Sequence, residues 1–361
     1  MLESFSLYDF KCLHVADMGF SNINVITGRN SSGKSSVIQA LNLMSDHLVS
    51  KPENGSISQL VSTAHQIRPY SDYRNMYCNC DNFKLKATIA GGHTYDMTFN
   101  PADEMLKGTL VAFEESGDDD ASFPLIYHLP ASRQSNRDSY KMNHDSRVPL
   151  GKEGEFIVDF YFTHRDMKVS ESFKVNEDSS LEYNLNYWLQ ILTGYSIKVI
   201  LESETYNVFF VDVIGNEIRP SQVGTGVGFV AAILMVCMCS ENDSLIAIEN
   251  PEIHLHPGAQ ARLCEFLART AKVGKQLLIE SHSDHIINGF LVKVKEGEFI
   301  SNEKLKIYFF DDDNGDDDVE FCMKPYELNI SPKGRINNAP TDFFDQIQID
   351  VRKLLDIESN E

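Results

Sequence analysis

Positive charge is scarce in this sequence of 361 residues, in which 32 lysines and arginines stand against 53 aspartates and glutamates, a formal net charge of −21. A chain this acidic is not expected to coat nucleic acid with its whole surface, because phosphate contacts need a concentrated positive surface. One local basic segment leaves DNA contact open as an alternative to a plain solvated loop. Its cations are Arg133, Arg137, Lys141, Arg147 and Lys152.

Long hydrophobic runs are also absent. The longest, residues 227–239, is about 13 residues long, whereas a transmembrane helix needs about 20. The N-terminus lacks the basic and apolar regions of a signal peptide, and no sustained heptads indicate a coiled-coil arm. The seven cysteines form no disulfide framework, which favours the cytoplasm. We therefore expect a cytoplasmic protein without a membrane partner.

Helix and strand patterns divide the chain into three predicted regions. An ATPase-like α/β core is expected over residues 1–50 and 221–300, where apolar strands alternate with helices such as residues 223–240, 257–270 and 284–295. Residues 51–220 have short alternating runs, `EFIVDFYF` among them, and predict a β-rich insert. Residues 301–361 predict a short α+β extension, with a hairpin around the Asn-Gly turn of `DDDNGDDD` and a final helix. The fold class is α/β with a mixed central sheet.

The segment `GRNSSGKS`, residues 28–35, lies between an apolar strand and an amphipathic helix and matches G-x-x-x-x-G-K-[ST] in full. Backbone N–H groups of such a turn cradle phosphates. Lys34 is expected to reach the β- and γ-phosphates of ATP, and the Ser35 hydroxyl to reach Mg²⁺. The predicted nucleotide-binding residues here are Gly28, Arg29, Asn30, Ser31, Ser32, Gly33, Lys34, Ser35 and Ser36.

A second apolar strand, `SLIAIE`, ends in Glu249, which is expected to hold magnesium if this strand is a neighbour of the phosphate-binding strand. Asn250 follows where a hydrolase would carry its catalytic acid. Glu252 is the nearest remaining acid, and His282, just past the strand `QLLIES`, can contact the γ-phosphate or the attacking water. We name Asn250, Glu252 and His282 as the catalytic candidates and Ser35 and Glu249 as the metal candidates.

Two further patterns involve metal-type or anion-binding residues. The glycine-rich turn `SQVGTGVG` precedes the long apolar helix, and Ser221, Gly224 and Gly226 are candidates for a second phosphate contact. The histidines of `HLH` and `HSDH` are of zinc-ligating type, although the phosphate turn already accounts for a magnesium site. Cys-x-Cys pairs occur at Cys78/Cys80 and Cys237/Cys239, and the second pair is expected in the core.

In their order along the chain, these motifs resemble the ABC-type ATPase head of the RecF, SMC and OLD (overcoming lysogenisation defect) families. Asp9-Phe10-Lys11 is similar to their N-terminal turn. `ENPEIHLHP`, `ESHSDHIING` and `GRINNAPTDFFDQ` resemble most a bacterial subgroup of single-head ATPases that have a short C-terminal domain of unknown function. The signature departs from Leu-Ser-Gly-Gly-Gln, and Gln59 and Gln66 are only candidates for a Q-loop glutamine.

The resemblance implies an ATP- and Mg²⁺-dependent head that forms a head-to-tail homodimer around ATP, with slow hydrolysis because Asn250 cannot accept a proton. It further implies a switch or sensor in antiphage defence or DNA maintenance that controls a separate effector such as a nuclease. Asp311 and Asp313 superficially resemble a nuclease pair but fit an acidic hairpin better. The alternatives are a RecF-like repair ATPase, with DNA contacts at Arg133, Arg137, Lys141 and Arg147, and an ATP-dependent scaffold with negligible hydrolysis.

Overall fold

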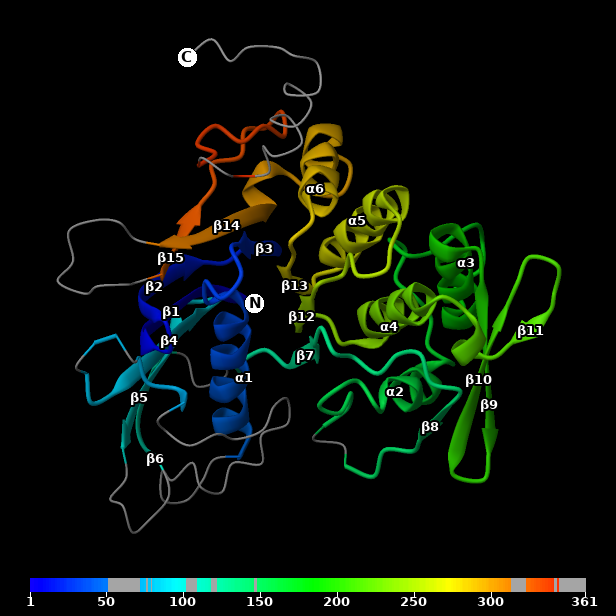
Figure 1. Ribbon diagram of the computed structural model, residues 1–361, viewed down its shortest axis with the longest axis horizontal. Helices are drawn as coiled ribbons and strands as arrows, with labels where there is room; N and C mark the ends of the chain where they lie inside the picture. Colours follow the sequence, from blue (N-terminus) through cyan, green and yellow to red (C-terminus); the bar gives the residue numbers. More distant parts are fainter. Residues whose placement is uncertain are drawn as a thin grey trace.

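A computed structural model describes residues 1–50, 72–75, 77, 78, 80–101, 109–117, 122–145, 148–312, 323–340 and 343 of the chain. Its backbone is organised around one eleven-stranded sheet with the order β6-β5-β4-β1-β2-β15-β14-β3-β13-β12-β7 (Figure 1). The strands are β1 (Leu2–Phe10), β2 (Leu13–Gly19), β3 (Ile23–Gly28), β4 (Phe83–Ile89), β5 (His93–Pro101), β6 (Thr109–Ser116), β7 (Ile126–Leu129), β12 (Leu245–Glu249), β13 (Gln276–Glu280), β14 (Leu305–Asp312) and β15 (Met323–Glu327). The expected mixed α/β sheet is confirmed.

One half of the sheet is parallel and carries the motifs. Strands β14, β3, β13, β12 and β7 are neighbours in that order, and each pair is parallel. Their carboxyl ends therefore meet at one edge of the sheet, where ligands bind in open α/β folds. The condition set for Glu249, that the acidic strand β12 lies beside the phosphate strand β3, is not met, because β13 lies between them.

The other half of the sheet is antiparallel, as the alternating N-terminal runs predict. β1 pairs with β2 and with β4, and β4, β5 and β6 continue the meander. β4 alternates buried and more exposed residues, which is the pattern of a strand with one face on the core. Lys11, in the tight turn between β1 and β2, has a φ of 55°.

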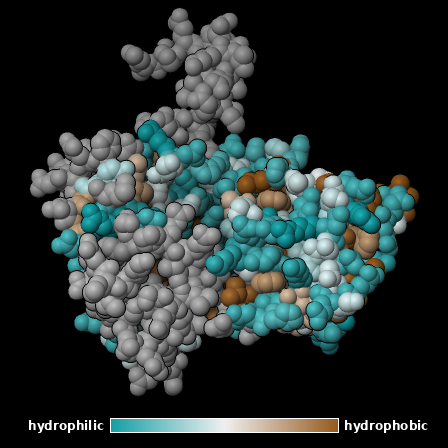
Figure 2. Space-filling view, turned by 60° about the horizontal axis from the view of Figure 1, so that its bottom comes forward, coloured by the Kyte–Doolittle hydropathy of each residue, from teal (hydrophilic) through white to brown (hydrophobic). Residues whose placement is uncertain are grey.

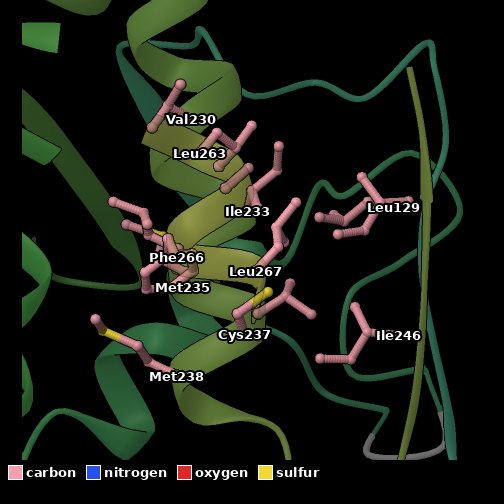
Figure 3. Close-up of a cluster of buried hydrophobic side chains, with 14 of the residues drawn as sticks. Leu129, Val230, Ile233, Met235, Cys237, Met238, Ile246, Leu263, Phe266 and Leu267 are labelled. Carbon is pink, nitrogen blue, oxygen red and sulfur yellow. The ribbon is translucent and has the colours of Figure 1, made fainter. Parts of the chain in front are cut away.

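Helices cover both faces of the parallel strands. Alternate residues of β12 point to opposite faces: Leu245 and Ala247 pack into the core with helix α1 (Lys34–Ser50), whereas Ile246 and Ile248 pack with α4 (Thr225–Cys239) and α5 (Pro257–Lys272). Figure 3 shows this second core, in which Cys237 lies among leucine and isoleucine side chains. The predicted helices at α4, α5 and α6 (Asp284–Glu296) and the core position of Cys237 and Cys239 are confirmed.

The region predicted to be β-rich contains two helices, α2 (Ile157–His164) and α3 (Leu181–Thr193). The prediction of a strand at `EFIVDFYF` is wrong. The five consecutive residues 157–161 are all buried, Asp159 among them, so burial does not alternate as it would in a strand with one exposed face. The same region does hold a small second sheet, made of β8 (Ser139–Lys141), β9 (Ser196–Glu202), β10 (Thr205–Val211) and β11 (Glu217–Ile218).

The C-terminal hairpin is confirmed as the antiparallel pair β14 and β15, while its Asn-Gly turn and the final helix fall outside the described residues. β14 pairs with the phosphate strand β3, and β7 pairs with β12, so the central sheet takes strands from all three predicted regions. The boundaries of those regions stay a prediction.

Among the described residues, no helix is both long and apolar enough to cross a membrane. Figure 2 shows a mostly hydrophilic face on which apolar side chains appear as small separate spots.

Candidate functional site

The phosphate loop joins β3 to α1, and two glycines give it its shape. Gly28 has a φ of 138°, and a Cβ at this position would lie 2.2 Å from the carbonyl oxygen of Phe310 in β14. Gly33 has a φ of 95°, and a Cβ there would lie 2.9 Å from the Cys12 sulfur. Both positions therefore need glycine for backbone conformation and for space.

Lys34 is buried at the start of α1, with 3% of its surface exposed. Its Nζ donates to the carbonyl oxygen of Gly28 at 3.2 Å and to that of Arg29, and it lies 3.3 Å from Ser32 Oγ. Burial lowers the pKa of Lys34, while the carboxylate of Glu280 opposes that shift. The ammonium group is thus held inside the loop, where the phosphates of a nucleotide would replace the carbonyl oxygens as its partners.

Glu280, the last residue of β13, lies next to the phosphate loop and is the residue that the sequence analysis missed. Ser35 Oγ donates to Glu280 Oε1 at 3.0 Å, whereas Glu280 Oε2 is buried and has no hydrogen-bond partner in the described structure. Burial raises the pKa of Glu280 to about 7, and the nearby Glu249 carboxylate adds to the rise. The signal in the sequence was a glutamate at the end of an apolar strand. The same kind of signal identified Glu249.

Glu249 lies one strand further from the loop and faces β7. Its Oε1 is 3.0 Å from His128 Nε2, and its Oε2 accepts a hydrogen bond from the Ala131 backbone at 3.0 Å. Burial acts to raise the pKa of Glu249, but the hydrogen bond and charge of His128 prevail and lower it. Ser35 is therefore brought together with Glu280 rather than with Glu249. His128, at the carboxyl end of β7, was also missed, because the order of the strands is not visible in the sequence.

Asn250 has a φ of 45°, a left-handed conformation that asparagine tolerates better than most residues. Its backbone N–H donates to the Glu280 carbonyl at 2.7 Å, and its side-chain Oδ1 is buried without a partner in the described structure. The turn that follows β12 is therefore attached to β13 through the main chain.

Arg133 holds the same turn from the other side. Its guanidinium donates to the carbonyl oxygens of Glu249 at 2.7 Å and Asn250 at 3.3 Å, and it lies 4.4 Å from the ring centroid of Phe229 in α4. The side chain is 3% exposed, and burial lowers its pKa to about 10. The alternative of a DNA contact at Arg133 does not fit the structure, since its guanidinium is buried and bonded to backbone carbonyl oxygens.

Glu252 and His282 belong to one hydrogen-bonded unit. Glu252 accepts a hydrogen bond from Ser281 Oγ at 2.9 Å and from the His282 backbone at 2.8 Å. Burial and the charge of Lys34 lower the pKa of His282, so its imidazole is neutral at pH 7 and can accept a hydrogen bond. Glu252 thus holds the loop that presents His282 to the site.

A pocket of about 480 Å³ lies over this edge of the sheet. Its lining includes the phosphate-loop residues 30–36, and on one side Glu280 and His282. On the other side are Lys11, Cys12, Asp72, Arg74 and Tyr77. Arg29 lies outside the lining, and its Nε is 3.6 Å from Asp311 of β14. Gln59, Gln66, Asp313 and Arg147, the last a candidate DNA contact, fall outside the described residues.

The glycine-rich turn forms the start of α4. Ser221 is exposed, and its hydroxyl and backbone N–H both donate to Asp138 at 2.9 Å. Gly224 is the exposed N-cap residue of α4, and a Cβ there would meet nothing within 4 Å. Gly226 is buried instead. A Cβ there would lie 2.5 Å from the His254 carbonyl oxygen, so this position has no room for a side chain. Gly224 is thus open to a partner, Ser221 is exposed but bonded to Asp138, and Gly226 serves internal packing.

Comparison with known proteins gives one extensive family match. The family model described as "AAA ATPase domain" matches residues 1–109 and 134–287, and the model described as "Protein of unknown function (DUF3696)" matches residues 300–354. No curated protein sequence matches the chain.

Several solved structures share the fold. An SMC head domain from Thermotoga maritima has 11% identity and a TM-score of 0.50, covering 91% of this chain and 99% of that one. An SMC head bound to the C-terminal winged-helix domain of ScpA has 14% identity and a TM-score of 0.55, covering 91% and 97%. A Pyrococcus furiosus SMC head domain bound to the C-terminal domain of ScpA has 12% identity and a TM-score of 0.54, covering 99% of both chains.

The raised pKa of Glu280 predicts a pH-dependent stability difference. An acid with a folded-state pKa near 7 and an ordinary value of 4.5 makes the folded protein less stable as pH rises between these values. The glutamine of Glu280→Gln cannot ionise. The free energy of unfolding of this variant minus that of the wild type should therefore increase from pH 5 to pH 8, by on the order of 1–3 kcal/mol. Urea denaturation without nucleotide or divalent cation measures this. The exposed Glu298→Gln is the control, and a difference for Glu280→Gln that does not change with pH contradicts the prediction.

Proposed function

We propose, from the premise that this chain belongs to the AAA ATPase domain family, that it is a slowly hydrolysing ATP-dependent switch. It binds ATP with Mg²⁺ in the pocket over the phosphate loop and forms a head-to-tail dimer. In its dimeric state it controls a separate effector. The observation that carries the proposal is the buried, unpartnered Glu280 Oε2 beside Ser35, at the mouth of a complete phosphate loop.

Ser35 and Glu280 fit a magnesium ion. A hydroxyl and a carboxylate are the oxygen ligands that Mg²⁺ takes alongside substrate phosphates, and a cation would satisfy the oxygen that no group of the described structure bonds. Ser35 and Glu280 would hold the ion, which would supply positive charge against the negative charge of the phosphates. Glu249, the acid expected from the sequence, is the weaker candidate, since both of its oxygens already accept hydrogen bonds.

The protein groups around the γ-phosphate support slow chemistry. Lys34 places a positive charge at the phosphates, and neutral His282 is positioned to accept a hydrogen bond from water. Asn250 supplies no base, and both oxygens of Glu252 are occupied in holding the loop of Ser281 and His282. Loss of a general base typically lowers a rate by on the order of 10²–10⁴-fold. We therefore assign Glu252 to positioning His282 rather than to proton abstraction.

Single-turnover hydrolysis of Mg-ATP tests this assignment. The wild type should release phosphate slowly but above the background of Lys34→Ala. Asn250→Asp, which adds a carboxylate at the missing position, should be faster than the wild type by at least about tenfold. If the wild type releases phosphate no faster than Lys34→Ala, the protein is a scaffold that binds ATP without hydrolysing it, and the slow-ATPase proposal is wrong.

Glu252→Gln separates positioning from base catalysis in the same assay. Glutamine keeps one acceptor oxygen for the loop. The hydrolysis rate of the variant should therefore fall by less than the loss expected for a missing base, which is on the order of 10²–10⁴-fold. A loss in that range with unchanged nucleotide affinity would make Glu252 the base.

The dimer interface is proposed to place Gly224 of one subunit opposite the nucleotide of the other. Gly224 is exposed at the N-terminus of α4, where backbone N–H groups and the helix dipole favour an anion. The head-to-tail arrangement is the one that the resemblance to ABC-type heads implies.

Gly224→Asp and Gly224→Asn test the dimer as a matched pair. Both residues are good N-caps and both have space, so both variants should fold. Only aspartate sets a negative charge against the phosphates of the opposite subunit. Light scattering with a non-hydrolysable ATP analogue and Mg²⁺ should show dimers for the wild type and Gly224→Asn and monomers for Gly224→Asp. Dimers of all three would exclude this face from the interface.

A separate effector is the part of the proposal that rests on resemblance. SMC heads of the same fold have been solved in complex with domains of ScpA, so a head of this kind can engage another protein. For this chain we propose an effector such as a nuclease, in an antiphage or DNA-maintenance system of the cytoplasm. Such a partner should co-purify with Gly224→Asn in the presence of ATP and not with Gly224→Asp.

Direct DNA binding, as in a RecF-like repair ATPase, is a second candidate function. Arg137, Lys141 and Lys152 are exposed, line one hollow of about 950 Å³, and have no ion-pair partner in the described structure. These three cations share the hollow with the carboxylates of Glu153, Glu155 and Glu249, in a chain of net charge −21. Phosphates are the natural anions for such a surface.

The triple variant Arg137→Gln/Lys141→Gln/Lys152→Gln tests this candidate. The slope of log K against log salt for duplex DNA binding changes by about 0.9 for each phosphate contact. Loss of three contacts should therefore make this slope less steep by about 2.7. Fluorescence anisotropy between 50 and 200 mM salt measures the slope. The control replaces three other exposed lysines, Lys84, Lys86 and Lys333, with glutamine, and an equal change in both triples rejects a specific site.

A further inference from the structure

Three side chains of metal-ligating type, Asp9, His14 and Cys78, converge beside the nucleotide pocket, and Cys80 lies next to Cys78. Asp9 ends the β1 side of the β1–β2 turn, His14 lies in β2, and Cys78 and Cys80 lie in a loop far along the chain. Asp9 Oδ1 is 2.5 Å from His14 Nδ1 and 3.2 Å from Cys78 Sγ. The ligand atoms of these three residues all lie within 4.8 Å of one another, and the Cys80 thiol is within hydrogen-bonding reach of Cys78.

The backbone holds the two segments together. The Lys11 N–H donates to the Tyr73 carbonyl at 2.8 Å, and the Asn75 N–H donates to the Asp9 carbonyl at 2.8 Å. Asp9 itself has a φ of 55°, which directs the chain into the turn. The donor atoms therefore come from segments whose separation is fixed by main-chain bonds, as ligands from distant parts of a chain must be in a preformed metal site.

The donor set identifies the class of ion. Two thiols with an imidazole and a carboxylate suit a borderline-soft cation, above all Zn²⁺, whereas Mg²⁺ and Ca²⁺ take oxygen ligands. Zn–N and Zn–S bonds of about 2.0 and 2.3 Å place the ligand atoms of a tetrahedral site about 3–4 Å apart. The Asp9–Cys78 separation of 3.2 Å lies in that range, whereas the Asp9–His14 separation of 2.5 Å is that of a hydrogen bond and would lengthen around an ion. We propose that Asp9, His14, Cys78 and Cys80 form a structural zinc site.

Zinc binding at this place replaces hydrogen bonds by metal–ligand bonds. Each cysteine binds as a thiolate, so two protons leave to solvent as the ion enters, and no electron is transferred. Without the ion, burial and the bonds to Cys80 and Asp9 raise the pKa of the Cys78 thiol to about 12.

The site would join two walls of the nucleotide pocket. Lys11 and Cys12 of the β1–β2 turn line that pocket, and so do Arg74 and Tyr77 of the cysteine loop. A zinc ion between the two segments would fix their separation. This consequence, unlike the metal site itself, rests on the proposed nucleotide binding.

Metal content of the full-length protein tests the proposal. After expression with zinc and gel filtration, mass spectrometry should find about one zinc per chain. Cys78→Ser/Cys80→Ser and His14→Ala should each bind zinc at least about tenfold more weakly. Cys12→Ser, a neighbouring cysteine outside the cluster, and His144→Ala, an exposed histidine, should keep the metal. Equal zinc in the cluster variants and the controls overturns the proposal.

Cobalt substitution keeps the test independent of variants that fail to fold. The wild-type protein loaded with Co²⁺ should show thiolate-to-cobalt absorption in the near ultraviolet and strong visible bands of tetrahedral geometry. Absence of both, or a Cys78–Cys80 disulfide in protein purified under reducing conditions, means that the cluster is only a hydrogen-bonded turn.

A third readout separates this inference from the proposed function. The affinity for ATP is measured without Mg²⁺, before and after removal of zinc. If zinc is present but its removal does not change this affinity, the metal site is supported and its effect on the nucleotide pocket is excluded. If ATP does not bind at all, zinc content and the cobalt spectrum still decide whether the site exists.

Discussion

Three carboxylates gather at the carboxyl edge of the parallel strands, and the site depends on how each negative charge is neutralised. Glu249 is stabilised by His128 and a backbone N–H group, and Glu252 by the Ser281–His282 loop. Only Glu280 keeps an oxygen without a partner in the described structure. Because burial makes an unpaired carboxylate costly, the fold leaves one position at which either a proton or a cation must enter. That position adjoins the phosphate loop.

Local patterns predicted much of the fold, and sheet order accounts for most of what they missed. The phosphate loop, β12, β13 and helices α4 to α6 follow from their apolar periodicity and flanking turns. The sequence cannot tell that β13 separates β3 from β12, because strand order arises from long-range packing. That single fact moved the acid next to Ser35 from Glu249 to Glu280. Helix α2 was missed because a short run that is apolar except for Asp159 cannot be distinguished from a buried strand by periodicity alone.

Arg133 shows a second limit of sequence reasoning. In the sequence it is one of several cations in a basic segment, and charge alone suggested a surface role. In the fold it binds the carbonyl oxygens of Glu249 and Asn250 and stacks on Phe229 of α4. The residue therefore connects the turn after β12 to the helix that begins at Gly224. Through Arg133, a displacement of α4 by a second subunit would shift that turn.

The position of β14 has a consequence for the synthesis of the protein. β3, which bears the phosphate loop, has β13 on one side and β14 on the other, and Gly28 touches Phe310 directly. A ribosome makes β3 almost three hundred residues before it makes β14, and pairings between such distant segments form slowly. The phosphate strand of a nascent chain therefore stays open on one side until residues 305–312 have emerged. A chain interrupted before them carries the whole phosphate motif in its sequence but lacks the strand that pairs with β3 on that side.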